Sequence, residues 1–165
     1  MTGLTRVITI FMFILIGLLF VIFAGFSYLG YQSRNMNMGY QLVNGKLKAC
    51  PPKPNCINTD APSSAQGIEP VNLQALHIDN LQPKLIETIE KTGGAIVYAT
   101  PQHIAAIYQS RLFGFVDDLE IRIDNKSHQV FFRSASRVGH NDLQANHNRV
   151  KNIIKQLSAN KAVQE

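Results

Sequence analysis

The sequence is poor in charged residues and in cysteine, and it has no excess of glycine or proline. Charged side chains make up 16% of the 165 residues, against roughly 25% in an average globular protein, which argues against a disordered chain or a coiled coil. With 11 Gly and 7 Pro, the chain is neither collagen-like nor of low complexity. Two cysteines are too few for a disulfide-stapled mini-protein. The length of 165 residues favours one domain with a tail or an anchor.

Hydrophobic residues, by contrast, are concentrated in one run near the N-terminus. Residues 7–29 contain no charged side chain. A helix of this length rises about 1.5 Å per residue and reaches about 35 Å, enough to cross a bilayer core of roughly 30 Å. We therefore predict that residues 7–29 form a transmembrane helix and that the membrane is a partner of this protein.

A cleaved signal peptide is the main alternative for this run, and a buried core helix is a weaker one. The run is longer than the roughly 7–15 apolar residues of a signal peptide, and no A-x-A-like cleavage site follows it. The flanking charges bear on orientation, because Arg34, Lys46 and Lys48 outnumber Arg6. Counted strictly, the positive-inside rule places the C-terminal part in the cytoplasm.

The two cysteines favour the opposite orientation. Cys50 and Cys56 enclose three prolines, which favour turns, so a disulfide is the preferred interpretation over free thiols, a metal site or a redox pair. Zinc needs about four ligands, and no second such pair exists, so we predict neither a metal nor a cofactor. Disulfides persist in oxidising compartments, which favours an extracytoplasmic domain, periplasmic if the protein is bacterial.

The pattern of apolar and turn-forming residues predicts an α+β domain. Asp79 and Asn80 precede a helical pattern that stops at Gly93, and a final helix follows Asp142 with Leu143 on its apolar face. Strands are expected over residues 95–100, 103–110, 113–124 and 128–135. Short connections imply a mostly antiparallel, four-stranded sheet with two helices packed on it. The predicted divisions are an N-terminal tail (1–6), the transmembrane helix (7–29), a juxtamembrane linker (30–46), the domain (47–158) and a C-terminal tail (159–165).

The second half of the chain contains a polar block with two short motifs. These are F-V-D-D over residues 115–118 and R-S-A-S-R-x-G over residues 133–139, and the motif C-P-x-x-P-N-C lies upstream at residues 50–56. Together and in this order, the motifs resemble the domain of unknown function 1499 family over roughly residues 47–158. The resemblance implies a bacterial or plastid-associated protein behind a signal or an anchor, and it implies no particular activity.

Asp117 shares a predicted strand face with Leu119 and Ile121, so its carboxylate must be paired or hydrogen-bonded. Arg133 or Arg137 is the expected partner. The simplest interpretation is a structural ion-pair network. The candidates for such a network, or for a ligand site, are Asp117, Asp118, Arg133, Ser134, Ser136, Arg137, Asp142, Asn146 and Arg149.

Three functions fit this polar block. The first is a binding or accessory module for an anionic small molecule, a lipid head group or a protein, in which Arg133, Arg137 and Arg149 line one concave site. The second is a hydrolase that uses Ser134, Ser136 or Asp117, with His140 or His147 as base. The third is a purely structural or assembly domain. Nucleic acid is not an expected partner, because the net charge of +5 comes without a basic cluster interleaved with aromatics.

Overall fold

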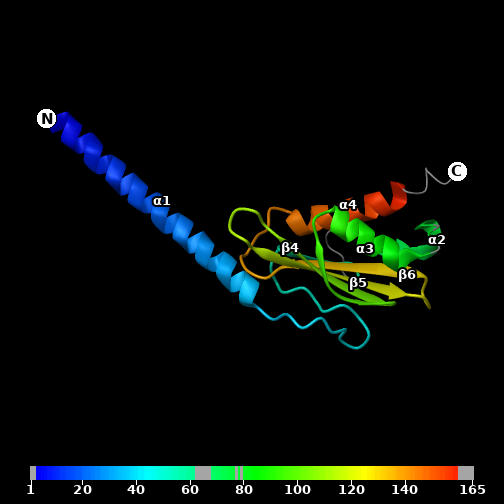
Figure 1. The fold of residues 1–165 in the computed structure, drawn as a ribbon. Helices are drawn as coiled ribbons and strands as arrows, with labels where there is room; N and C mark the ends of the chain where they lie inside the picture. Colours follow the sequence, from blue (N-terminus) through cyan, green and yellow to red (C-terminus); the bar gives the residue numbers. More distant parts are fainter. Residues whose placement is uncertain (1–2, 62–67, 77, 79, 160–165) are drawn as a thin grey trace.

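A long exposed helix begins the chain. The computed structural model describes residues 3–61, 68–76, 78 and 80–159. Helix α1 (Gly3–Asn35) extends the predicted segment 7–29 at both ends and projects away from the domain (Figure 1). By its length and composition the helix is long and apolar enough to cross a membrane, and its apolar side chains are exposed over most of its length.

The domain is α+β, as predicted, with an antiparallel sheet in the order β1-β6-β5-β4-β3 and with β2 also paired to β6. The strands are β1 (Cys56–Asn58), β2 (Val71–Asn72), β3 (Ala95–Thr100), β4 (His103–Gln109), β5 (Val116–Asp124) and β6 (Gln129–Ser136). The other helices are α2 (Leu73–Leu76), α3 (Leu81–Lys91) and α4 (Ala145–Ala159). Helices α3 and α4 cover one face of the sheet (Figure 1).

The prediction of four strands is wrong, because the described residues form six. Strands β1 and β2 have only three and two residues, too few to show a periodic pattern. Strand β5 begins at Val116 rather than Phe113, because Gly114 adopts a positive φ of 69° and ends the preceding turn. Leu143 lies before α4 and is exposed rather than on its apolar face. Asn80 makes no side-chain capping bond, and Asp79 lies outside the described residues.

Over β4, β5 and β6 the sheet has two buried faces of different composition, whereas β3 is largely exposed. On the helix face, apolar side chains such as Ile104, Leu119 and Phe132 pack under α3 and α4. The opposite face carries buried charged residues, and we call it the strap face because residues 36–55, the strap, run across it before entering β1 (Figure 1). Backbone and side-chain hydrogen bonds join the strap to the sheet region, including Asn58 Nδ2 to the Lys48 carbonyl oxygen at 3.1 Å.

Candidate functional site

Asp118 and Arg137 form a bidentate ion pair at the end of the strap face. Arg137 donates from Nε to Asp118 Oδ2 at 3.0 Å and from Nη2 to Asp118 Oδ1 at 2.7 Å, and Asp118 is only 1% exposed. The Tyr40 hydroxyl of the strap donates to Asp118 Oδ1 at 2.9 Å. Burial, reinforced by the Asp118 charge, raises the pKa of Tyr40 to about 12. The F-V-D-D motif and the R-S-A-S-R-x-G motif therefore contact each other through Asp118 and Arg137, and this pair binds Tyr40 of the strap.

The same arginine reaches the C-terminal end of α1. Arg137 Nη1 donates to the carbonyl oxygens of Ser33 at 3.1 Å and Met36 at 3.0 Å. The last carbonyl groups of a helix have no partner within it, and a cation there also interacts favourably with the negative end of the helix dipole. Ser33 is fully buried, and its hydroxyl accepts a bond from the Val116 N–H at 2.7 Å. Asp118 and Arg137 thus connect the C-terminal end of α1 to the sheet.

Three further contacts complete this junction between α1 and the domain. A side chain at Gly30 would meet the Phe113 carbonyl oxygen at 1.8 Å, so only glycine permits this approach. Arg34 Nη1 donates to that same oxygen at 3.1 Å. The Phe113 ring packs against Phe23 and Phe26, with centroid separations of 5.5 Å and 5.2 Å. Residues 30–35, predicted as part of a linker, are helical, and Gly30 and Ser33 among them are buried.

Asp117 lies on the helix face, where it forms a separate network. Its partner is Arg149 of α4, whose Nη2 is 2.7 Å from Asp117 Oδ2 and whose guanidinium lies over the Tyr108 ring at 4.4 Å. The prediction that Arg133 or Arg137 pairs with Asp117 is wrong. Both of those arginines pair with carboxylates on the strap face, because neighbouring residues of a strand point to opposite sides.

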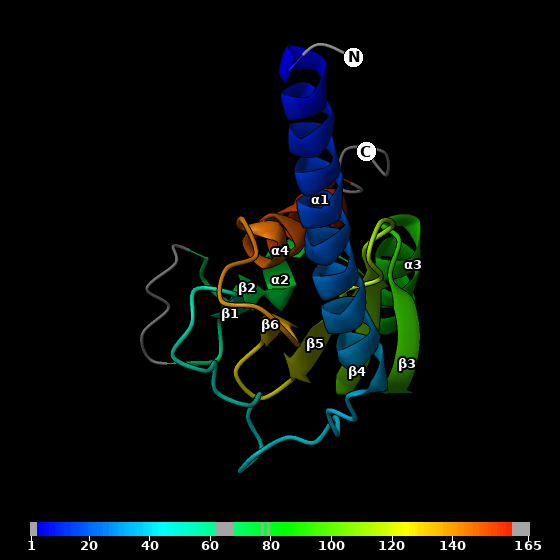
Figure 2. The same ribbon diagram turned by 90° about the vertical axis from the view of Figure 1, so that its left-hand side faces the viewer.

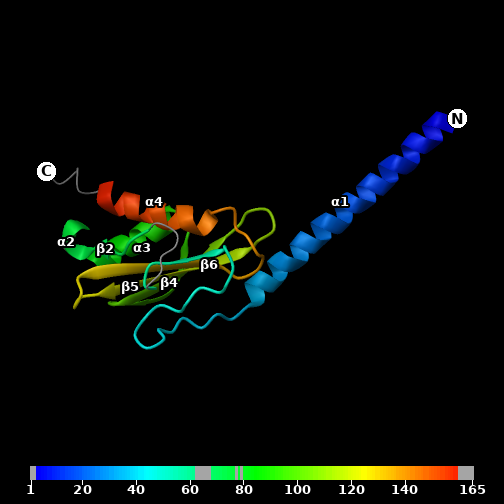
Figure 3. The same cartoon turned by 180° about the vertical axis from the view of Figure 1, so that it is seen from behind.

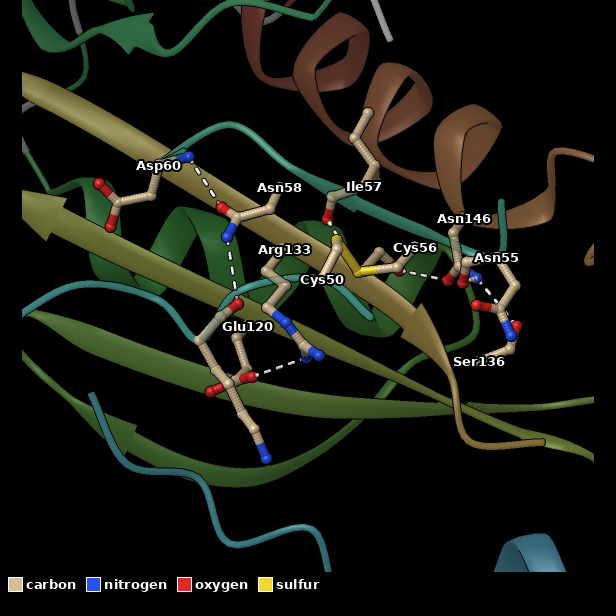
Figure 4. Close-up of a disulfide and its surroundings, with 12 residues drawn as sticks. Cys50, Asn55, Cys56, Ile57, Asn58, Asp60, Glu120, Arg133, Ser136 and Asn146 are labelled. Carbon is tan, nitrogen blue, oxygen red and sulfur yellow. Dashed lines mark hydrogen bonds and ion pairs between the residues drawn. A yellow bond between two sulfur atoms is a disulfide. The ribbon is translucent and has the colours of Figure 1, made fainter. Parts of the chain in front are cut away.

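Asn146 is the centre of the helix-face network. Its Nδ2 donates to the carbonyl oxygen of Asn55 at 3.1 Å, to Ser136 Oγ at 2.9 Å and to Asp142 Oδ2 at 2.8 Å. Its Oδ1 accepts from Ser134 Oγ at 2.6 Å. Figure 4 shows Asn55, Ser136 and Asn146 gathered where α4 begins. The predicted polar residues here join α4, β6 and the end of the strap.

The strap face carries two further ion-pair groups that sequence reasoning missed. Arg133 donates to Glu120 at 3.1 Å, as Figure 4 shows, and His103 Nε2 lies 3.4 Å from the other Glu120 oxygen. Asp60 binds Arg122 through both carboxylate oxygens, at 2.7 Å and 2.8 Å. Strand alternation places Glu120 and Arg122 on one face with Asp118, but alternating charged residues give no signal that this face is buried.

The predicted disulfide is confirmed, because Cys50 and Cys56 are bonded with a Cα–Cα distance of 5.7 Å (Figure 4). It closes the last turn of the strap onto β1. A pocket of about 290 Å³ opens beside it. The pocket is lined by Pro54, Cys56, Asn141, Asp142, Gln144, Asn146 and His147.

This arrangement does not bring the three arginines into one site. Arg133 and Arg137 lie on the strap face and Arg149 on the helix face, and each is paired with a carboxylate. Ser134 is 0% exposed and bonded to Asn146 and Arg149, so a substrate cannot reach its hydroxyl. Among the described residues, no group of three His, Cys, Asp or Glu side chains can hold a metal ion. Nothing here indicates catalysis.

Comparison with known proteins gives one match. A family model described as "protein of unknown function (DUF1499)" matches residues 46–157, which is most of the chain outside α1. No curated protein matches the chain.

Proposed function

This chain belongs to the DUF1499 family of proteins of unknown function, and we propose that it is a membrane-anchored, non-catalytic binding or accessory module. Helix α1 stays on the mature protein as its anchor, and the domain works at the membrane surface outside the cytoplasm. Its partner is a lipid head group or a protein, whereas an anionic small molecule loses its support because Arg133, Arg137 and Arg149 are each paired with a carboxylate. This proposal assigns the Asp118–Arg137 pair a positioning role rather than a chemical one.

The docked C-terminal end of α1 is the observation that supports this proposal best. Removal of a signal peptide would take away Phe23 and Phe26 and expose the Phe113 ring that they cover. Ser33 and the Arg137 guanidinium further bind helix and sheet together. A segment destined for removal has no need of such contacts. The junction therefore favours a retained anchor over a signal peptide, and it fixes the orientation of the domain relative to the helix.

The disulfide and the position of two lysines support an extracytoplasmic domain. The Cys50–Cys56 bond is stable in an oxidising compartment. Lys46 and Lys48 belong to the strap, which runs under the sheet away from the end of α1, so they carry little weight as flanking charges (Figure 1). What remains is Arg34 on one side and Arg6 with the amino terminus on the other, a count that no longer favours the cytoplasm.

Two measurements test the anchor and its side of the membrane. Intact mass spectrometry of the detergent-extracted protein should show a chain that retains residues 7–29. An alkaline phosphatase reporter at the C-terminus should be active, because that enzyme needs an oxidising compartment to form its disulfides. A mature chain without the apolar segment, or a reporter active only when fused before α1, would contradict the proposal.

A pair of glycine variants tests the junction itself. Gly30→Val places a side chain against the Phe113 carbonyl oxygen, whereas Gly25→Val in the same helix meets nothing within 4 Å. Gly30→Val should lower the melting temperature of the domain in the full-length protein by about 5 °C, the effect of roughly 1 kcal/mol in a domain of this size. Gly25→Val should leave it unchanged. Equal behaviour of the two variants would remove the support for a docked anchor.

A further inference from the structure

Two leucines stand out on the surface of the domain. Among the described residues outside α1, Leu112 and Leu143 are the most exposed large apolar side chains, at 74% and 88%. Leu112 belongs to the β4–β5 loop, residues 110–115, and Leu143 belongs to the β6–α4 loop, residues 137–144. Single exposed leucines are ordinary, but these two share a location. Both loops lie at the end of the domain from which α1 departs (Figures 1 and 3).

The β6–α4 loop holds Leu143 outward in a backbone conformation that leucine rarely adopts. Its φ is 52°, and that of the following Gln144 is 67°. Asn141 Oδ1 accepts the Leu143 N–H at 2.7 Å, and Asp142 Oδ1 accepts the Gln144 N–H at 3.1 Å. These bonds fix the turn, so the exposed position of Leu143 is built into the loop. Strain of this kind is found preferentially where a side chain has a role.

The β4–β5 loop contacts α1 at a defined position along the helix axis. Its Phe113 ring contacts Phe23 and Phe26, which belong to the apolar run that ends at Leu29. At a rise of about 1.5 Å per residue, these two positions lie about 9 Å and about 5 Å inside that end of the run. Elements that lie in a membrane interface are buried to a similar depth of about 5–10 Å.

The span cannot simply shift along α1 to leave this loop in water. A bilayer core needs about 20 apolar residues, so a span that ended before Phe26 would draw Arg6 into the hydrocarbon, where a charge is costly. Nor can the loop swing away from the helix. Arg34 Nη1 binds the carbonyl oxygens of Phe113 and Gly114, at 3.1 Å and 3.2 Å.

We propose that the two loops enter the lipid head-group region beside α1, with Leu112, Phe113 and Leu143 in contact with the bilayer. Figure 2, which looks onto the end of the domain from which α1 departs, shows the loops on either side of the helix. The bilayer is the occupant of this surface because the loops continue the lipid-facing surface of α1. The inference rests on the proposed function, since it requires α1 to remain in the membrane, and it names lipid as the partner at this end of the domain.

The absence of tryptophan from the sequence provides a direct test. Single Leu112→Trp and Leu143→Trp variants of the full chain are reconstituted into vesicles of phosphatidylcholine and phosphatidylglycerol, with the phosphatidylcholine brominated near the head-group end of its acyl chains. Bromine quenches only tryptophans that contact lipid. Both variants should emit at shorter wavelength than in water and lose most of their fluorescence.

Two control variants separate failure of this inference from failure of the anchor. Phe20→Trp lies within the apolar run and should be quenched, whereas Lys126→Trp lies in the β5–β6 turn at the opposite end of the domain and should not (Figure 1). Quenching of Phe20→Trp with full emission from both Leu112→Trp and Leu143→Trp would overturn the loop insertion and leave the anchor in place. Full emission from Phe20→Trp would overturn the anchor and the inference together.

Discussion

The two faces of the sheet are both buried over β4, β5 and β6, but by opposite chemistry. On the helix face, apolar side chains of β4, β5 and β6 pack beneath α3 and α4, and Ile104, Leu119 and Phe132 are fully buried. Burial of this kind is non-directional and stabilises in proportion to the apolar area removed from water. The helices need only the right apolar stripe and volume to cover it.

The strap face is covered by a chain segment that is polar, rich in proline and neither helical nor stranded over most of its length. The charged side chains buried on this face are paired: Asp118 with Arg137, Glu120 with Arg133, and Asp60 with Arg122. Buried pairs add little net stability compared with apolar side chains, but an unpaired partner is very costly. The helix face therefore provides stability, whereas the strap face specifies where the strap and α1 must lie.

The largest expected effect comes from the helix face. Phe132→Ala should destabilise the domain by about 3–5 kcal/mol, because it leaves a cavity in fully packed surroundings. Its neighbour Phe131 points to the strap face, where its ring lies 4.1 Å from the Arg122 guanidinium and remains slightly exposed. Phe131→Ala should cost less in the same denaturant titration. If both variants lose equal stability, the two faces are packed alike and the comparison fails.

Breaking one ion pair on the strap face should cost nearly as much as a core cavity, about 3 kcal/mol. Arg133→Met leaves the Glu120 carboxylate buried without its arginine, and His103 Nε2 stays 3.4 Å away. The double variant Glu120→Leu with Arg133→Met removes both charges and should recover most of that loss. Chemical denaturation of the three proteins measures this. A double variant less stable than Arg133→Met would show that the pair contributes net stability.

The disulfide should come next, at about 2 kcal/mol for a loop this short. A Cys50→Ser, Cys56→Ser variant should lose this stability and become insensitive to reductant. The loss should also be local, because the bond secures the strap. Hydrogen exchange at the Leu47 amide, which donates to Asp60, should rise, whereas exchange at the Ile121 amide on the paired strand β5 should not. A uniform rise at both amides would mean that the strap does not open independently.

Strand alternation, helix caps and turn signals predicted β3 to β6, α3 and α4, because these elements are long enough to be periodic. Alternation also identified Asp117 as a carboxylate on the apolar face that needs a partner, and the structure pairs it there with Arg149, half-buried. Its partner Arg149 belongs to α4, so no strand pattern could identify it, but the hairpin register does exclude Arg133. The register pairs Asp117 with Ser136 and Glu120 with Arg133, so Arg133 cannot share a face with Asp117.

The strap face could not be predicted from local pattern. Charged residues at alternate positions of β5 are normally solvent-exposed, and nothing in their spacing indicates that residues far away in sequence cover them. The end of α1 was missed for a related reason. Ser33 and Arg34 are polar residues after an apolar run, and only their contacts with Val116 and Phe113 show that they belong to a packed interface.

The smallest expected effect is at the point where the strap meets the junction. Tyr40→Phe removes the hydroxyl that donates to Asp118 and should cost about 1 kcal/mol at neutral pH, the net value of one hydrogen bond. Because the folded protein raises the pKa of Tyr40 from 10.0 to about 12, its contribution is complete below about pH 10 and is lost as the pH rises toward 12. Melting temperatures across this range should therefore fall less steeply for Tyr40→Phe than for the unchanged protein. The exposed Tyr31→Phe is the matched control and should follow the unchanged protein. A parallel fall in all three would mean that Tyr40 ionises as freely in the folded chain as in the unfolded one, and that the strap is not held at Asp118.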